Sequence, residues 1–128
     1  MRYQSVAEKL SIFHKAFNCP QNRTYKGNTI DDAELLVLRK NLIKEEVSEA
    51  LEAIDTKDAA SVLKELVDIV VVCIGMADTY GWDFDCAFTR VHRSNMSKLD
   101  DDGKPIYRED GKVLKSENYK PPYLDDLV

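Results

Sequence analysis

The chain has 128 residues and a mass of 14.6 kDa, the size of one ordinary globular domain. With 44% hydrophobic and 32% charged residues it is neither a disordered nor a fibrous chain, and its longest apolar runs are too short to span a membrane. The 23 acidic residues exceed the 18 basic ones, so binding to duplex nucleic acid through bulk charge is not expected. We predict a single domain, with a helical body over about 1–99 and a hairpin and tail over about 100–128.

The first two predicted helices begin at recognisable caps. Ser5 is a favourable N-cap for a helix that ends near Phe17. Thr29 followed by Asp32 resembles a capping box, and the helix that it opens has no glycine or proline before it ends near Ile54.

A third helix is predicted after residue 58, ending at residue 80 before Gly81, which favours a helix stop. Its β-branched segment 69–74 is not predicted to be a strand, because no breaker flanks it and the run is too long. The third helix is apolar nearly all round, which predicts burial on several sides. A fourth helix is predicted over about 84–97.

The C-terminal region changes character. Two short strands, 105–108 and 112–115, flank the turn 109–111 and predict a β-hairpin, and 118–123 is expected to be extended. The predicted fold class is therefore all-α: a four-helix, bundle-like body with a short C-terminal hairpin and an extended tail.

Helical periodicity sorts the acids of the second helix. The predicted core line of this helix consists of Leu36, Ile43, Val47, Ala50 and Ile54. Glu46 falls beside this line and Glu49 just beyond it on the same flank, whereas Glu45 and Glu52 lie on the opposite side. Two of these carboxylates are thus expected near an apolar boundary and two toward water.

The third helix repeats the arrangement. Glu46 and Glu49, like Glu65 and Asp68, lie three positions apart, so their side chains are neighbours on a helix. Four carboxylates that converge from adjacent helices would provide hard oxygen ligands for Mg²⁺, or for Mn²⁺. The alternative is that the acids lie on solvated faces and pair with lysines, namely Lys40, Lys44, Lys57 and Lys64.

Residues 45–49 (EEVSE) and 65–68 (ELVD) together resemble the EExxE…ExxD signature of the all-α nucleoside triphosphate pyrophosphohydrolases. This superfamily includes MazG, dimeric dUTPase, dCTP pyrophosphatase and phosphoribosyl-ATP pyrophosphohydrolase. The segment 91–99, the Asp-Gly-Lys-Pro turn, residues 108–112 and the tail resemble a MazG-like branch near phosphoribosyl-ATP pyrophosphohydrolase. The resemblance covers almost the whole chain.

The resemblance implies a set of site residues. Glu46, Glu49, Glu65 and Asp68 match the metal ligands, and one of Glu46 and Glu49 is expected to position the attacking water as a catalytic residue. Glu45 matches the first glutamate of the signature, but it faces away from the metal, so a supporting role is expected. Substrate contacts on the fourth helix are expected from Asn95 and Lys98. Some relatives carry a lysine where this chain has Val91, and Arg90 and Arg93 are expected to supply that charge.

Several other side chains keep alternative interpretations. Phe13 and Phe17 are either core residues or a platform on which a base stacks. His14 is either a contact to the substrate or a polar surface residue. Arg39 shares a side with Glu46 and pairs either with that residue or with substrate.

The predicted function is Mg²⁺-dependent hydrolysis of a nucleoside triphosphate between its α and β phosphates, giving a monophosphate and pyrophosphate. The alternatives are a non-catalytic helical oligomer that binds a nucleotide or protein, and a phosphoribosyl-ATP pyrophosphohydrolase. A homodimer or homotetramer is expected because the third helix is too apolar for a monomer of this size. No membrane partner is expected. The odd set of three cysteines and the lack of a leader pattern favour the cytoplasm, or a host's cytoplasm for a phage-encoded chain.

Overall fold

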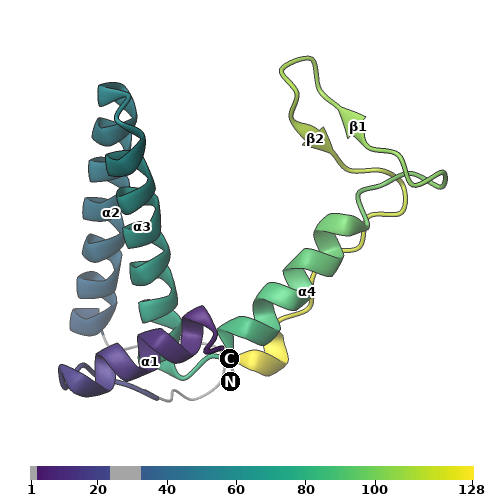
Figure 1. Ribbon diagram of the computed structural model, residues 1–128. Helices are drawn as coiled ribbons and strands as arrows, with labels where there is room; N and C mark the ends of the chain where they lie inside the picture. Colours follow the sequence, from purple (N-terminus) through teal and green to yellow (C-terminus); the bar gives the residue numbers. More distant parts are fainter. Residues whose placement is uncertain (1–2, 24–32) are drawn as a thin grey trace. The chain divides into compact units, whose positions relative to one another are not determined.

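The computed structural model describes residues 3–23 and 33–128, which form two compact units, 1–84 and 85–128 (Figure 1). The first unit contains α1 (Val6–Ala16), α2 (Ala33–Thr56) and α3 (Ala59–Tyr80). The second contains α4 (Phe84–Met96) from its second residue onward, β1 (Ile106–Tyr107), β2 (Val113–Leu114) and a short 3₁₀ helix (Asp125–Leu127). The all-α class and the C-terminal hairpin are as predicted. None of the described helices is long and apolar enough to cross a membrane.

The helix boundaries follow from local capping. Ser5 forms a reciprocal capping box with Glu8 at the start of α1. Asp58 accepts a hydrogen bond from the Ser61 amide at the start of α3, and Gly81 ends that helix in the left-handed conformation at φ +72°. These boundaries and the helical state of 69–74 agree with the prediction. The predicted capping box Thr29–Asp32 lies outside the described residues.

Helices α2 and α3 form an antiparallel hairpin, because only two residues connect them and they lie side by side (Figure 1). The predicted core line of α2 is partly wrong. Ala50 is buried as expected, but Val47 and Ile54 are 38% and 49% exposed. The buried stripe runs instead through Arg39, Ala50 and Ala53. The buried stripe is rotated around the helix from the predicted core line. This is because α2 packs chiefly against one helix, α3, and the small alanine side chains let the two helices approach closely.

Helix α3 is buried along only part of its length. Its C-terminal half, from Ile74 to Tyr80, contains the buried residues, at the level where α1 packs against it. In the N-terminal half, Leu63 is 64% exposed and Val70 is 45% exposed. The predicted burial on several sides therefore holds for half of the helix, and an apolar surface remains open on the other half.

A buried arginine joins α2 to α3. Arg39 is 7% exposed, and its guanidinium donates a 3.1 Å hydrogen bond to the main-chain carbonyl oxygen of Val72. Its path lies over Gly75, where a Cβ atom would collide with the Arg39 guanidinium and press on the His14 ring at 3.2 Å. Burial lowers the pKa of Arg39, since removal from water disfavours the charged form. The glycine in mid-helix thus makes room for a desolvated cation.

The second unit consists of α4, a β-hairpin and a C-terminal segment that is hydrogen-bonded to α4. Ile106 pairs with Leu114 and Tyr107 with Val113 in the antiparallel register of the predicted hairpin. The C-terminal segment then runs back along α4 (Figure 1). The 3₁₀ turn at its end was not predicted from the sequence.

Gly75→Ala is expected to destabilise the protein by about 1 kcal/mol, although alanine is about 1 kcal/mol better than glycine inside a helix. The methyl group must displace Arg39 from Val72, and the lost charge-assisted bond outweighs the gain in helix propensity. Chemical denaturation of the full chain measures the change.

The same substitution on an Arg39→Ala background is the control for this prediction. With the guanidinium gone, Gly75→Ala should be less destabilising by about 1 kcal/mol or more, because only the His14 ring then lies close to the added methyl group. Equal effects in both backgrounds would contradict the steric role of Gly75.

Candidate metal centre

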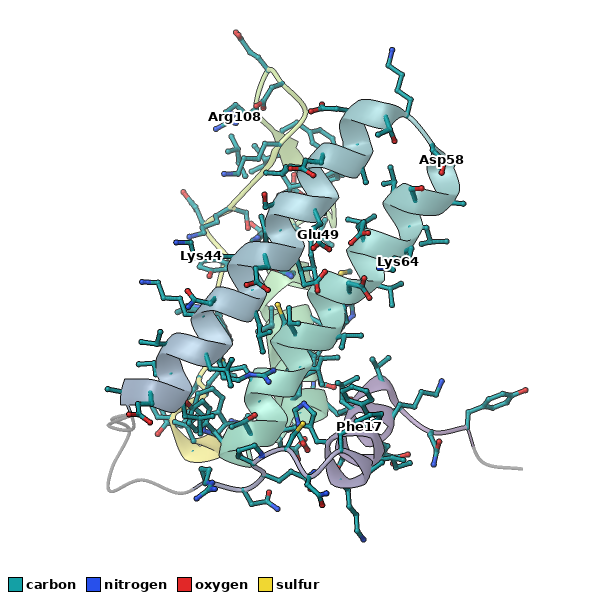
Figure 2. All side chains as sticks on the ribbon, turned by 90° about the vertical axis from the view of Figure 1, so that its left-hand side faces the viewer. Phe17, Lys44, Glu49, Asp58, Lys64 and Arg108 are labelled. Atoms are coloured by element: carbon teal, nitrogen blue, oxygen red, sulfur yellow. The ribbon has the colours of Figure 1, made fainter. Side chains whose placement is uncertain are left out.

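Three carboxylates converge across the α2–α3 hairpin. Glu46 and Glu49 come from consecutive turns of α2, and Glu65 comes from the facing turn of α3. One oxygen of each lies within 4.8 Å of one oxygen of each of the others. Figure 2 shows Glu49 on the face of the hairpin that also carries Lys64. The geometry therefore brings together three of the four predicted metal ligands.

The cluster is poorly compensated from within the chain. Oε2 of Glu46 and Oε2 of Glu65 are buried and accept no hydrogen bond from the described residues. Burial, and then the charges of Glu49, Asp68 and Glu65, raise the pKa of Glu46 above its ordinary value. Buried anionic oxygens that lack donors are costly, so the arrangement calls for a cation or a proton.

Asp68, the fourth predicted ligand, lies beside the cluster and pairs with a lysine. Its Oδ2 is 2.6 Å from Lys64 Nζ, and Glu65 is 3.5 Å from the same ammonium. The alternative of lysine pairing is thus correct for Lys64. That side chain is 66% exposed, however, so the pair is weak and Lys64 can swing into solvent. Glu45 and Glu52 are exposed, as predicted for the outer face of α2.

The donor set fits a hard divalent cation. All ligands are carboxylate oxygens, and no histidine or cysteine joins them among the described residues. The two buried oxygens that lack donors belong to two members of this cluster, Glu46 and Glu65. The cluster therefore has the composition of a divalent metal centre.

A network of polar side chains connects α1 to the C-terminal part of α3. His14 is 3% exposed, and its Nδ1 donates to Asp78 Oδ2 at 2.8 Å, where Gln21 Nε2 also donates at 2.9 Å. His14 is therefore not a polar surface residue. Arg39 donates to Val72 rather than to Glu46. Asp78 and Gln21 were not predicted, because no spacing along the chain connects residues 14, 21 and 78.

The two phenylalanines of α1 are at the surface. Phe13 is 47% exposed and Phe17 is 69% exposed, and their tilted rings have centroids 4.9 Å apart. The interpretation that they belong to the core is wrong. The exposed pair retains the alternative of a platform for an aromatic ring.

The predicted contacts on α4 lie on two faces. Arg90 and Arg93 line a groove against the C-terminal tail. Asn95 lies five residues after Arg90, a rotation of about 140° around the helix, whereas Lys98 follows the end of α4 at Met96. The residues that line this groove include the two arginines and neither Asn95 nor Lys98.

The model of the phosphoribosyl-ATP pyrophosphohydrolase family matches residues 10–95, which include α2, α3 and all four acids. The chain belongs to this family, which is part of the MazG-like all-α nucleoside triphosphate pyrophosphohydrolase superfamily.

One curated relative is an uncharacterized protein of Acanthamoeba polyphaga mimivirus. It is 28% identical over 115 residues, covering 89% of this chain. The matched region spans only 42% of the viral protein's own length. The likeness therefore concerns a part of that protein.

Glu46→Gln is expected to raise the melting temperature of the metal-free protein at pH 7 to 8. Because the folded-state pKa of Glu46 lies above its unfolded value, ionisation destabilises the fold as pH rises through that interval. The wild type should therefore gain stability relative to Glu46→Gln as the pH falls toward 5. Thermal unfolding in chelator at several pH values measures both effects.

Glu52→Gln is the matched control, since it removes an equal charge from the exposed side of α2. It should leave the pH dependence unchanged. A Glu46→Gln protein that melts below the wild type at pH 8 without metal would contradict the repulsion described for the cluster.

Proposed function

We propose that the chain is a Mg²⁺-dependent nucleoside triphosphate pyrophosphohydrolase. The observation that carries this proposal is the convergence of Glu46, Glu49 and Glu65 with buried oxygens that lack donors, on the helices matched by the family model. Water attacks the α phosphorus, the bond from that phosphorus to the oxygen bridging to the β phosphate breaks, and the products are a monophosphate and pyrophosphate.

The acids have distinct proposed roles. Glu46 and Glu65, whose buried oxygens lack donors, would bind the metal, and Asp68 would join them when Lys64 swings away. Glu49 is exposed at the same cluster, so it is the better placed of the two α2 glutamates to orient the attacking water. A bound Mg²⁺, or Mn²⁺, would neutralise phosphate charge. Glu45, which faces outward, would at most support its neighbours.

Other residues are proposed as contacts to the nucleotide. Asn95 and Lys98 would bind its polar groups and phosphates, as the resemblance implies. Phe13 and Phe17 offer an exposed aromatic surface for a base. His14 and Arg39 are buried, so we assign them to the support of this region through the contacts to Asp78 and Val72.

A homodimer or a dimer of dimers is proposed for the assembly. Val47, Leu51 and Ile54 of α2 are exposed at helical spacing, as are Leu63, Leu66 and Val70 of α3. Helical periodicity puts both sets largely on the side of the hairpin opposite Glu49 and Asp68. A second copy can therefore cover the apolar side while the carboxylates stay open.

We propose that the reaction takes place in the cytoplasm, or in a host's cytoplasm if the chain is encoded by a virus. The proposal rests on the nucleotide substrate, the odd number of cysteines, three, and the likeness to a viral protein. Duplex nucleic acid and membranes are not proposed as partners.

Pyrophosphate release from a panel of ribo- and deoxynucleoside triphosphates tests the proposed activity. With Mg²⁺ the wild type should release pyrophosphate, and chelation should abolish it. Glu49→Gln and Asp68→Asn should each lower the rate by about 100-fold or more, since each removes a charge from the reacting centre. Glu52→Gln should keep the wild-type rate. Equal rates in all variants would contradict the site, and nucleotide binding without turnover would favour a non-catalytic protein.

Phosphoribosyl-ATP is the second candidate substrate, because the matching family model bears its name. Assaying it beside the triphosphate panel, at matched concentrations, decides between the two. A higher kcat/KM for phosphoribosyl-ATP than for each triphosphate would replace the proposed substrate but keep the proposed bond cleavage.

The double substitution Leu51→Glu with Leu63→Glu is expected to convert the oligomer to a monomer, because it puts charges in the proposed apolar interface. Light scattering at micromolar concentration measures the mass. Val113→Glu, at another exposed apolar position, should leave the mass unchanged. A wild-type monomer would contradict the proposed assembly.

A further inference from the structure

The second unit contains a preformed groove between α4 and the C-terminal tail, with a volume of about 520 Å³. Ser94 Oγ donates to the Lys120 carbonyl oxygen at 2.7 Å, and the Lys120 amide donates to Ser97 Oγ at 2.9 Å. Arg90 donates to the Tyr123 carbonyl oxygen at 2.9 Å. Because these bonds fix the tail to the helix at three points, the groove walls are set before anything binds.

The groove has a positive charge in an acidic protein. Arg90 lines the groove, but a two-point ion pair with Asp126, at 2.5 and 2.9 Å, neutralises its charge. Arg93 and Lys120 also line the groove, and both are exposed. Neither of these two side chains has an ion-pair partner in the described part of the chain. Two uncompensated cations in a chain of net charge −5 mark a place for an anion.

An apolar wall completes the groove. Pro121, Pro122 and Tyr123 line it, and Tyr123 is 65% exposed, so its ring is accessible to a planar group. The volume lies within the range of small-molecule sites in proteins. An aromatic ring beside two cations has the composition that receives a base together with a phosphate.

We propose that this groove is a second nucleotide site, in which a nucleoside monophosphate stacks its base on Tyr123 and places its phosphate against Arg93 and Lys120. Neither Asn95 nor Lys98, the contacts proposed for the hydrolysed substrate, lines this groove, and Arg93, which the sequence resemblance offered as a substrate contact, is assigned here to the groove instead. It contains no carboxylate cluster among its lining residues, so binding here needs no divalent metal. The inference does not rest on the proposed activity.

Calorimetric titration of the full chain with AMP, in chelator and at low salt, tests the proposal. Chelator keeps phosphates off the acidic cluster, where bare carboxylates repel them. Saturable binding is expected, with the affinity lowered by about tenfold or more in Arg93→Ala and in Tyr123→Ala. Inorganic phosphate and adenosine should each bind more weakly than AMP, because each has only one of the two recognised groups.

Two exposed residues of the hairpin serve as matched controls, Lys112→Ala for the cation and Tyr107→Ala for the aromatic ring. Both should bind AMP as the wild type does, and so should Glu49→Gln. The proposal is overturned by absence of AMP binding, by binding that survives Arg93→Ala and Tyr123→Ala, or by loss of binding in Glu49→Gln. Inorganic phosphate that binds as tightly as AMP would also overturn it. Circular dichroism of each variant shows that its fold is intact.

Discussion

Carboxylates from two helices are pressed together along the α2–α3 hairpin, and mutual repulsion among them is the constraint on which the rest depends. Glu46 and Glu65 each bury one oxygen that the described chain leaves without a donor. Charges packed in this way weaken a metal-free protein unless a proton or a cation reduces them. Burial, and then the charges of the neighbouring carboxylates, raise the pKa of Glu46. A divalent ion would turn the same arrangement from unfavourable to favourable.

The hairpin tolerates this acidic cluster because packing contacts between α2 and α3 lie on both sides of it. Ala50 and Ala53 bring the helices close on one side of the acids, and Arg39 crosses Gly75 on the other. Several larger apolar side chains of α2 and α3, such as Leu51 and Leu63, lie outside the seam. We infer that one side of the hairpin serves the metal and the opposite side serves assembly, which separates chemistry from association on the same two helices.

Much of the fold could be predicted from local signals. The caps at Ser5 and Asp58, the stop at Gly81 and the hairpin turn each depend on neighbours in sequence, and each appears where it was expected. The core line of α2 could not be predicted well. Periodicity ranks residues by hydrophobicity, so it favoured Val47 and Ile54 over the smaller alanines that the helix contact selects.

The site shows the same division between local and long-range information. The spacing of the acids predicted that Glu46, Glu49 and Glu65 would meet. The lysine pairing of Asp68 depends on a rotamer, and the contact of His14 with Asp78 spans 64 residues, so neither follows from a pattern. Gly75 was a usable signal, because a glycine inside a long helix often marks a close approach.

The most direct test of the metal centre is a titration of the full chain with Mn²⁺, in which electron paramagnetic resonance counts the free ion. We expect saturable Mn²⁺ binding in the wild type. Binding should be lost in the double variant Glu46→Gln with Glu65→Gln and retained in the double variant Glu45→Gln with Glu52→Gln. Both double variants remove two negative charges, so a general electrostatic effect cancels in the comparison. Equal Mn²⁺ binding by the two double variants would contradict a metal centre at this cluster.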